Sequence, residues 1–427
     1  MMHAGAAELD ITPPLGLNMP GLFHERLAQT IHDPLMVRSL VMESNGSGAA
    51  IAVCDLIGID RLLLDEAKNR IEKSTGLPPS AILISCTHTH TGTEAEEWTD
   101  YTRWMVNRIV DSVTIAWSRR VAAEVGWASA SEPRLPFNRR FKMKDGTYRT
   151  NPGIGNPDIV EPGGPVDPEV GALCLRHASG SSESGKIIGL LGNYSMHYIG
   201  GGDHERAISA DYFGMFAKHI CQLREAPFVA ALSVGASGDI NNIDVKGSRR
   251  PNDRYQHTDR ASVLLAAAAY WAINEMEFKC DLPIASAIEE IVLPRRPVTE
   301  EDLKRADELE KLERPTMSEA VTVWLVRRMT ESPKETRTWV QALRIGALGI
   351  VAVPGELLVD LGLEIKRRSP FSMTTVIELA NDNVGYVPSR QTFEEGGYEP
   401  TCSPFEPGAG EQIVETALAL LGQLRSN

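Results

Sequence analysis

Apolar and polar positions along the chain form two kinds of segment. Short continuous apolar runs predict buried strands, and runs with an apolar residue every three or four positions predict amphipathic helices. The predicted strands cover residues 48–60, 81–86, 185–197, 226–242 and 374–382, and the predicted helices cover residues 61–76 and 100–121. Alternating strands and helices of this kind favour an α/β fold with central mixed β-sheets flanked by helices.

Three further segments complete this picture. Residues 339–356 predict a β-hairpin with glycines near its turn. The stretch 133–170 is rich in Pro, Gly, Asn and Asp, and its turn chemistry predicts a long ordered loop. The charged stretch 299–335 predicts a peripheral helical segment. Because the sequence contains no internal repeat and no long low-complexity linker, we expect a single domain over residues 1–427.

Composition and charge narrow the class of protein. A hydrophobic content of 42% is typical of a globular protein, and no apolar run approaches the roughly 20 residues that span a bilayer. The N-terminus lacks a basic region followed by an apolar one, and the scattered cysteines form no CxxC pair, so we expect a cytoplasmic protein with reduced thiols.

The net charge of the chain indicates which classes of partner to expect. A net charge of −14 disfavours nucleic acid and stable membrane association, which leaves a small molecule as the expected partner. The oligomeric state stays open, homo-oligomers included.

Polar and ionisable residues follow several of the predicted strands. They are Asp55, His88, His90, His197, Asp239, Glu356 and residues 381–386. In open α/β sheets, ligands bind at the carboxyl ends of strands, so these residues are candidates for one site.

Two of these residues suggest a metal. His88 and His90 stand at i and i+2, and on extended backbone that spacing points both imidazoles to one face. They could therefore approach one metal ion, or form only a hydrogen-bonded pair at a strand end. His197 is either a further ligand or a structural histidine. Two or three histidines with a carboxylate such as Glu356 would make a zinc site, which lowers the pKa of a bound water to about 7 and polarises a carbonyl.

Arg139 is either a solvated charge or a clamp for an anion or oxyanion.

Seven short motifs occur together in one order over about residues 8–410. They read DITPPLGLNMPG, CTHTHTG, FNRR, NYSMH…SADYFG, GASGDIN, VPGELLVDLGLEIKRR and ANDNVGYVPS…GGYEP. Their combination resembles the neutral/alkaline non-lysosomal ceramidase family. The resemblance implies the fold of that family's catalytic domain, without its C-terminal immunoglobulin-like domain.

The resemblance also implies a site with one Zn²⁺ per chain. Its metal ligands would be His88, His197, Glu356 and Tyr386. Next to the substrate it would place His90 and Arg139, with Asp211, Tyr398 and Glu399 matching further family positions. Physical reasoning alone gave Tyr386 no such role.

One departure from the family concerns the substrate. Where ceramidases carry Gly-Asp-Val-Ser-Pro-Asn, this chain reads Gly-Asp-Ile-Asn-Asn from Gly238, so Asn241 replaces the family serine. Ser237 falls at an apolar position of that motif. This departure puts ceramide itself in question and leaves the metal site intact.

We therefore expect a zinc-dependent hydrolase whose metal-bound water attacks a carbonyl, most simply a linear amide. His90 and Arg139 would hold the substrate, Asn241 would donate a hydrogen bond, and Asp239 or Glu399 would handle protons. The alternatives are a hydrolase of a soluble polar ester, lactone or sugar derivative, and a non-catalytic binding protein on the same fold.

Overall fold

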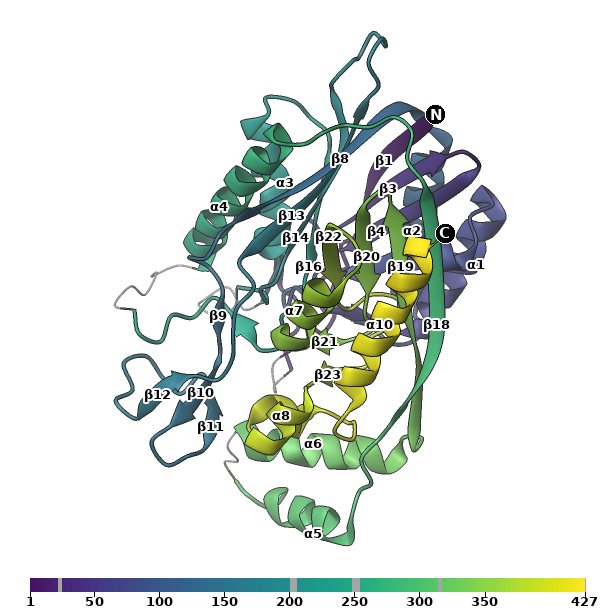
Figure 1. Ribbon diagram of the computed structural model, residues 1–427. Coiled ribbons are helices and arrows are strands. Elements are labelled where there is room, and N and C mark those ends of the chain that lie inside the picture. The colour runs from purple at the N-terminus through teal and green to yellow at the C-terminus, as the bar shows by residue number, and fades with distance from the viewer. Residues whose placement is uncertain (22–24, 200–205, 248–253, 314–316, 427) are drawn as a thin grey trace.

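The structure, a computed structural model, describes residues 1–21, 25–199, 206–247, 254–313 and 317–426. An eight-stranded mixed sheet has the order β16-β14-β13-β8-β1-β3-β4-β6 (Figure 1). Its strands are β1 (Met2–Asp10), β3 (Met36–Ser44), β4 (Ser47–Cys54), β6 (Ile82–Cys86), β8 (Val121–Ser131), β13 (Glu169–His177), β14 (Ile187–Tyr194) and β16 (Val229–Val234). A second sheet, β18-β19-β20-β22, consists of β18 (Ile284–Pro294), β19 (Glu335–Ile345), β20 (Leu348–Ala352) and β22 (Met373–Ile377).

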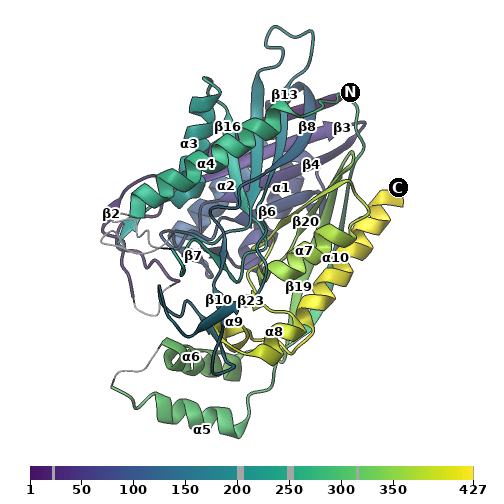
Figure 2. The same cartoon turned by 60° about the vertical axis from the view of Figure 1, so that its left-hand side comes forward.

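The two sheets pack face to face between helices. One buried cluster joins Leu40, Ile51 and Leu83 of the first sheet to Leu343 and Ile350 of the second. Helices cover the outer faces (Figures 1 and 2). On the first sheet they are α1 (Arg61–Thr75), α2 (Asp100–Ser118), α3 (Asp211–Leu223) and α4 (Arg254–Asn274), and on the second α7 (Val359–Arg368) and α10 (Ala409–Ser426). The predicted α/β fold with mixed sheets and flanking helices is confirmed.

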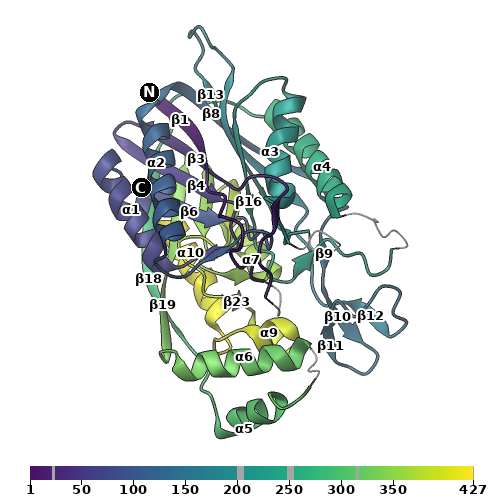
Figure 3. The ribbon, with the colours of Figure 1, turned by 180° about the vertical axis from the view of Figure 1, so that it is seen from behind.

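Parallel pairing is confined to particular places in the two large sheets. In the eight-stranded sheet the two edge pairs, β4–β6 and β14–β16, are parallel, and the pairs between them are antiparallel. In the second sheet β20–β22 is parallel. Each pair is joined by a crossover helix, α1, α3 or α7. Edge strand β16 also contacts β3, β4 and β6, so the sheet curls and its two edges approach each other (Figure 3).

Short elements surround the strand ends. They are β2 (Thr30–Ile31), β5 (Gly58–Ile59), η1 (Pro79–Ala81), β7 (Glu94–Ala95), β15 (Ala207–Ile208), β17 (Ile240–Asn241), β21 (Glu356–Leu357), β23 (Tyr386–Val387), α8 (Arg390–Glu395) and α9 (Tyr398–Cys402). Strands β21 and β23 pair in parallel, which sets Glu356 opposite Tyr386.

Local signals placed several boundaries well. Helix α1 ends at Gly76, whose φ of +78° suits the left-handed cap position that glycine favours. The predicted hairpin is β19–β20, and Gly346 at its turn has φ +62°. The stretch 299–335 contains α5 (Glu300–Leu309) and α6 (Met317–Glu331) at the lower end in Figure 1.

The prediction of a long loop over 133–170 is wrong in part. This stretch contains β9 (Phe137–Asn138), β10 (Arg140–Met143), β11 (Tyr148–Thr150) and β12 (Ile159–Pro162), and the last three form a small sheet. The strands are only two to four residues long and are separated by turn residues. Segments this short show no usable alternation of apolar and polar positions. Among the helices of the described chain, none is long and apolar enough to cross a membrane.

Candidate metal centre

Three imidazoles converge beside the strand ends of the eight-stranded sheet. One ring nitrogen from each of His88, His90 and His197 lies within 4.8 Å of the other two. The Nε2 atoms of His88 and His90 are 3.0 Å apart, and all three side chains are buried. The structure thus brings together the histidines that the sequence singled out.

The geometry of His88 differs from the prediction. Strand β6 ends at Cys86, and His88 lies beyond it with a left-handed φ of +62°. The two histidines therefore meet through a turn, not through strand alternation. The Nδ1 of His88 lies 2.8 Å from the carbonyl oxygen of Ile57, and the backbone N–H of His88 donates to the carbonyl oxygen of Leu56 at 2.9 Å. A left-handed non-glycine residue costs about 1–2 kcal/mol, and such strain clusters at functional sites.

His197 is held in a similar way from the other edge of the sheet. It follows β14, and its Nδ1 lies 2.6 Å from the carbonyl oxygen of Ser237, which follows the neighbouring strand β16. Its backbone N–H donates to Ile240 at 3.2 Å. Because β14 and β16 are parallel, the histidine that follows one strand lies next to the carbonyl that follows the other.

His90 is fixed by the N-terminal segment. Its ring stacks on Tyr198, with centroids 3.7 Å apart, and its Nδ1 lies 3.1 Å from the carbonyl oxygen of Gly21. Gly21 has φ +96°, and a Cβ there would lie 2.3 Å from that Nδ1. The motif ending at Gly21 therefore makes room for His90, a role that sequence reasoning did not assign.

The hydrogen bonds of the three rings favour a bound cation. Each Nδ1 faces a backbone carbonyl, which can only accept, so each Nδ1 carries the proton and each Nε2 presents a lone pair. Two lone pairs 3.0 Å apart repel each other unless a positive charge, either a metal ion or a proton, lies beside them. A carbonyl on the far nitrogen is also the usual arrangement behind metal-bound histidine.

Glu356 adds an oxygen to this group. Its Oε2 lies 3.0 Å from the Nε2 of His197 and 3.4 Å from that of His88. Ligands about 2.1 Å from one tetrahedral ion are about 3.4 Å from each other, so these separations fit a shared ion. Tyr386, opposite Glu356 on β23, accepts a hydrogen bond from Nη2 of Arg139 at 2.9 Å.

Burial and mutual charge set the protonation of the centre. Burial, and then the Arg139 charge, lower the pKa of His197 to about 4, and burial with the two other histidines holds the pKa of His90 well below its usual value. Burial acts against the Glu356 carboxylate, but His88 and His197 outweigh it and hold its pKa well below the usual range. Burial acts against a proton on His88, but the Glu356 carboxylate outweighs it and raises the pKa of His88. Neutral imidazoles and an ionised carboxylate are the forms that bind a metal, so metal binding would release any proton on His88.

Arg139 lies beside Tyr386 at the edge of this group. Its Nε donates to Glu399 at 2.8 Å, and its Nη2 donates to the carbonyl oxygen of Gly238 at 2.7 Å as well as to Tyr386. Glu399 is fully buried and also accepts from Thr150 at 2.9 Å. The structure thus joins Arg139, Tyr386 and Glu399 in one network next to Glu356.

The other predicted residues lie close by and already have partners. Asp239 accepts from Asn138 at 2.7 Å and from the backbone of Val359 at 2.9 Å, and burial raises its pKa to about 6. Asn241 donates to Asn151 at 2.8 Å.

Three further predicted residues have contacts of their own. The rings of Tyr398 and Tyr386 are 5.8 Å apart. Asp211, the first residue of α3, accepts from the backbone N–H groups of Tyr212 and Ile199. Asp55 is not part of the group, because its carboxylate accepts from Arg38 and Met36.

Sequence reasoning missed one buried carboxylate. Glu378, just after β22, accepts from the Oγ of Ser237 at 2.6 Å, and burial raises its pKa to about 8. The only sequence signal was a charged residue in the middle of the strand predicted over residues 374–382.

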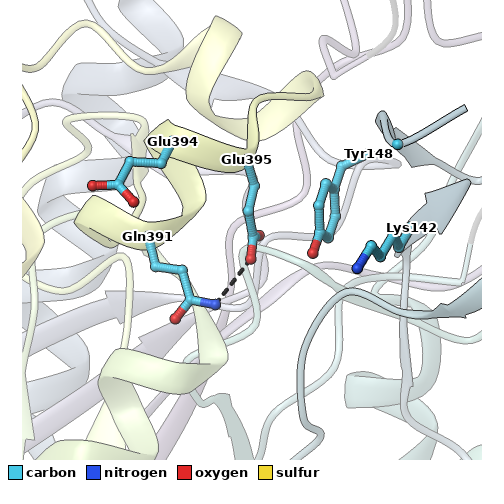
Figure 4. Close-up of a pocket in the computed structure, with 6 residues that line it drawn as sticks. Lys142, Tyr148, Gln391, Glu394 and Glu395 are labelled. Carbon is cyan, nitrogen blue, oxygen red and sulfur yellow. Dashed lines mark hydrogen bonds between the residues drawn. The ribbon is translucent and has the colours of Figure 1, made fainter.

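A wide polar cleft lies elsewhere, between the β10–β11 hairpin and α8 (Figure 4). It has a volume of about 720 Å³ and is lined by Lys142, Gly146, Tyr148, Gln391, Glu394 and Glu395. Within it Gln391 donates to Glu395 at 2.9 Å. None of the histidines lines this cleft, so it is separate from the candidate metal centre.

Comparison with known proteins places the fold. No family model matches the sequence. No curated protein matches it significantly either. Among solved structures, the neutral ceramidase from Pseudomonas aeruginosa matches with a TM-score of 0.76 and 19% identity over 100% of this chain and 74% of that one. A ceramidase complexed with C2 matches with a TM-score of 0.77 and 18% identity over 100% of this chain and 75% of that one. The chain therefore has the neutral ceramidase fold, as the sequence resemblance predicted.

Proposed function

We propose that this protein is a metal-dependent hydrolase with one zinc ion per chain. The observation that carries the proposal is the convergence of three imidazole Nε2 atoms, each aimed by a carbonyl on its Nδ1, beside the ionised Glu356. The ceramidase fold supports the same class of reaction. The ligand set that we propose is His88, His197, Glu356 and Tyr386, with His90 lining the site.

A metal bound there would supply Lewis acidity, which polarises a carbonyl and makes water acidic enough to act near neutral pH. The chain's own residues would orient the substrate. Arg139 is buried between Glu399 and Tyr386, where its fixed guanidinium would hold the oxyanion. Asn241 stands where a ceramidase has serine, and its amide would donate to the substrate. Asp239 or Glu399 would move protons.

The preferred substrate class is a linear amide, as in ceramidases. The second candidate class is a soluble polar ester, lactone or sugar derivative, which Asn241 in place of the family serine and the acidic chain favour. Turnover of a long-chain N-acyl sphingosine in detergent would support the first class. Turnover restricted to small polar compounds would support the second.

The deciding experiment is metal content by mass spectrometry. We expect about one zinc per wild-type chain and loss of zinc in both His197→Ala and Glu356→Ala. His219→Ala is the matched control, because His219 pairs with Asp259 on the surface away from the centre and should leave the zinc content unchanged. Wild-type protein that takes up no metal after zinc is supplied would refute the hydrolase mechanism and favour a binding protein on this fold.

A further inference from the structure

Residues 378–381 lie at the meeting point of three loops. The backbone N–H of Glu378 donates to Val234 of β16 at 3.2 Å. On the other side, Leu379 accepts from Cys86 of β6 at 3.1 Å, and Asn381 donates to Ile84 at 2.8 Å. This segment therefore bridges the two edges of the eight-stranded sheet, next to the ends that lead to His197 and His88.

The same segment also reaches the loop that carries Glu356. The N–H groups of Leu379 and Ala380 donate to Gly355 at 3.3 Å and to Val353 at 3.0 Å. Leu379 and Asn381 both have left-handed φ values, of +49° and +65°. Strained backbone of this kind persists only where surrounding contacts impose it.

Glu378 extends this arrangement toward the metal centre. Both of its carboxylate oxygens accept from Ser237, one from Oγ at 2.6 Å and the other from the backbone N–H at 3.1 Å. Glu378 therefore fixes Ser237 through both its backbone N–H and its hydroxyl group. The carbonyl oxygen of Ser237 faces the Nδ1 of His197 at 2.6 Å. All three side chains are buried.

We infer that Glu378 is a positioning residue that acts through Ser237 to fix the tautomer and direction of the His197 imidazole. This inference rests on the proposed metal centre for its functional meaning, but the orientation of His197 can be measured without metal. A buried carboxyl group, charged or neutral, is costly unless it is hydrogen-bonded, and here both oxygens bond the one residue that orients His197. Packing alone would be served better by an apolar side chain.

The test compares Glu378→Ala with Glu378→Gln, since glutamine can still bond both groups of Ser237. In metal-free protein, ¹⁵N spectra of the imidazoles report the tautomer, and the His197 signals are assigned from their absence in His197→Ala. We expect protonated Nδ1 in wild type and in Glu378→Gln, and a mixture of tautomers in Glu378→Ala. Ser237→Ala keeps the backbone donor and should give a smaller change in the same direction.

Metal affinity provides the second readout, measured by chelator competition. We expect Glu378→Ala to weaken zinc affinity about 10–100-fold and Glu378→Gln to stay within about threefold of wild type. Glu124→Ala is the control, because Glu124 is a buried carboxylate paired with Arg176 on the far part of the sheet. It should lower stability without changing zinc affinity.

Four outcomes distinguish the role of Glu378 from the proposed metal site. Wild-type tautomer in both Glu378→Ala and Ser237→Ala would overturn the inference, and so would equal losses of affinity in Glu378→Ala and Glu124→Ala. If wild type binds no metal, the proposed function fails, while the tautomer still decides the role of Glu378. If Glu378→Ala does not fold, Ser237→Ala carries the tautomer test.

Discussion

The two edges of the eight-stranded sheet support their histidines by the same means but to different degrees. In the β4–α1–β6 unit, the carbonyl of Ile57 holds His88, and Ile57 is itself held by a backbone bond to Thr93 at 3.2 Å. In the β14–α3–β16 unit, the carbonyl of Ser237 holds His197, and Ser237 is held by Glu378, 141 positions away in the chain. The carbonyl that holds His88 is therefore supported by its own neighbourhood, whereas the carbonyl that holds His197 is supported by a residue that follows the second sheet.

The difference extends to the charges around each histidine. The β16 edge also carries Arg139, whose backbone N–H donates to the carbonyl oxygen of Asp239 at 2.8 Å. At the β6 edge, two threonines flank His90, and the nearby buried guanidinium of Arg26 donates to the backbone carbonyl oxygen of His90 at 2.6 Å. We propose that the β6 edge mainly holds the metal, whereas the β16 edge also contacts the substrate.

The largest effect that would test this asymmetry comes from Arg139→Gln. Loss of one donor to a developing oxyanion typically costs about 10²–10³ in rate, so turnover should fall by that factor while zinc content is kept. The measurement is kcat with saturating zinc on the best substrate from the screen. Arg38→Gln is the matched control, because Arg38 is similarly buried, pairs with Asp55 outside the candidate site and should affect stability more than turnover. An unchanged kcat in Arg139→Gln would show that the two edges do not differ in their contribution to turnover.

An intermediate effect is expected from Gly21→Ala at the β6 edge. The new Cβ would lie 2.3 Å from Nδ1 of His90, and the left-handed backbone disfavours alanine, so His90 must tilt. We expect turnover to fall about 10–100-fold, the usual cost of a misplacement of about 1 Å, with zinc retained.

The control for Gly21→Ala is Gly16→Ala, which has φ +90° but open space around it. It should reproduce the backbone strain without moving His90. Loss of zinc in Gly21→Ala alone would show that His90 is a ligand, and the β6 edge would then supply two of the imidazoles.

The smallest effect concerns Lys68 in the crossover helix α1. Lys68 is 3% exposed, and burial lowers its pKa to about 7. Because the unfolded chain binds this proton up to about pH 10 and the folded chain releases it near pH 7, the wild-type free energy of unfolding should rise between these values.

Lys68→Met should therefore be more stable than wild type by about 1–3 kcal/mol at pH 6, and this advantage should shrink toward pH 10. Urea unfolding at both pH values measures it. Zinc affinity should not change, since Lys68 belongs to neither histidine's support. A change in affinity would mean that α1 contributes to the centre, and the comparison of the two edges would need revision.

Sequence patterns predicted what depends on local chemistry. Apolar runs located the strands β4, β6, β14, β16 and β22, and Gly76 and Gly346 marked a helix end and a turn. Histidines after strands indicated the candidate metal centre. The long strands β1, β3, β8, β13 and β18 were not predicted, because small, polar or charged residues interrupt their apolar runs. The other failures concern contacts between distant segments and very short elements. The left-handed backbone of His88 leaves no mark in the sequence, and the bond between Ser237 and Glu378 follows only once two sheets are packed.

The bridge formed by residues 378–381 also bears on the order of folding. Asn381 bonds Ile84 across 297 positions, so this contact closes one of the longest loops in the chain. Contacts at such separation form late, because much chain entropy is lost before they stabilise anything. During synthesis the β6 and β14 edges leave the ribosome long before residue 378. We therefore expect nascent chains to acquire tight metal binding only at the last stage of folding, when the second sheet docks.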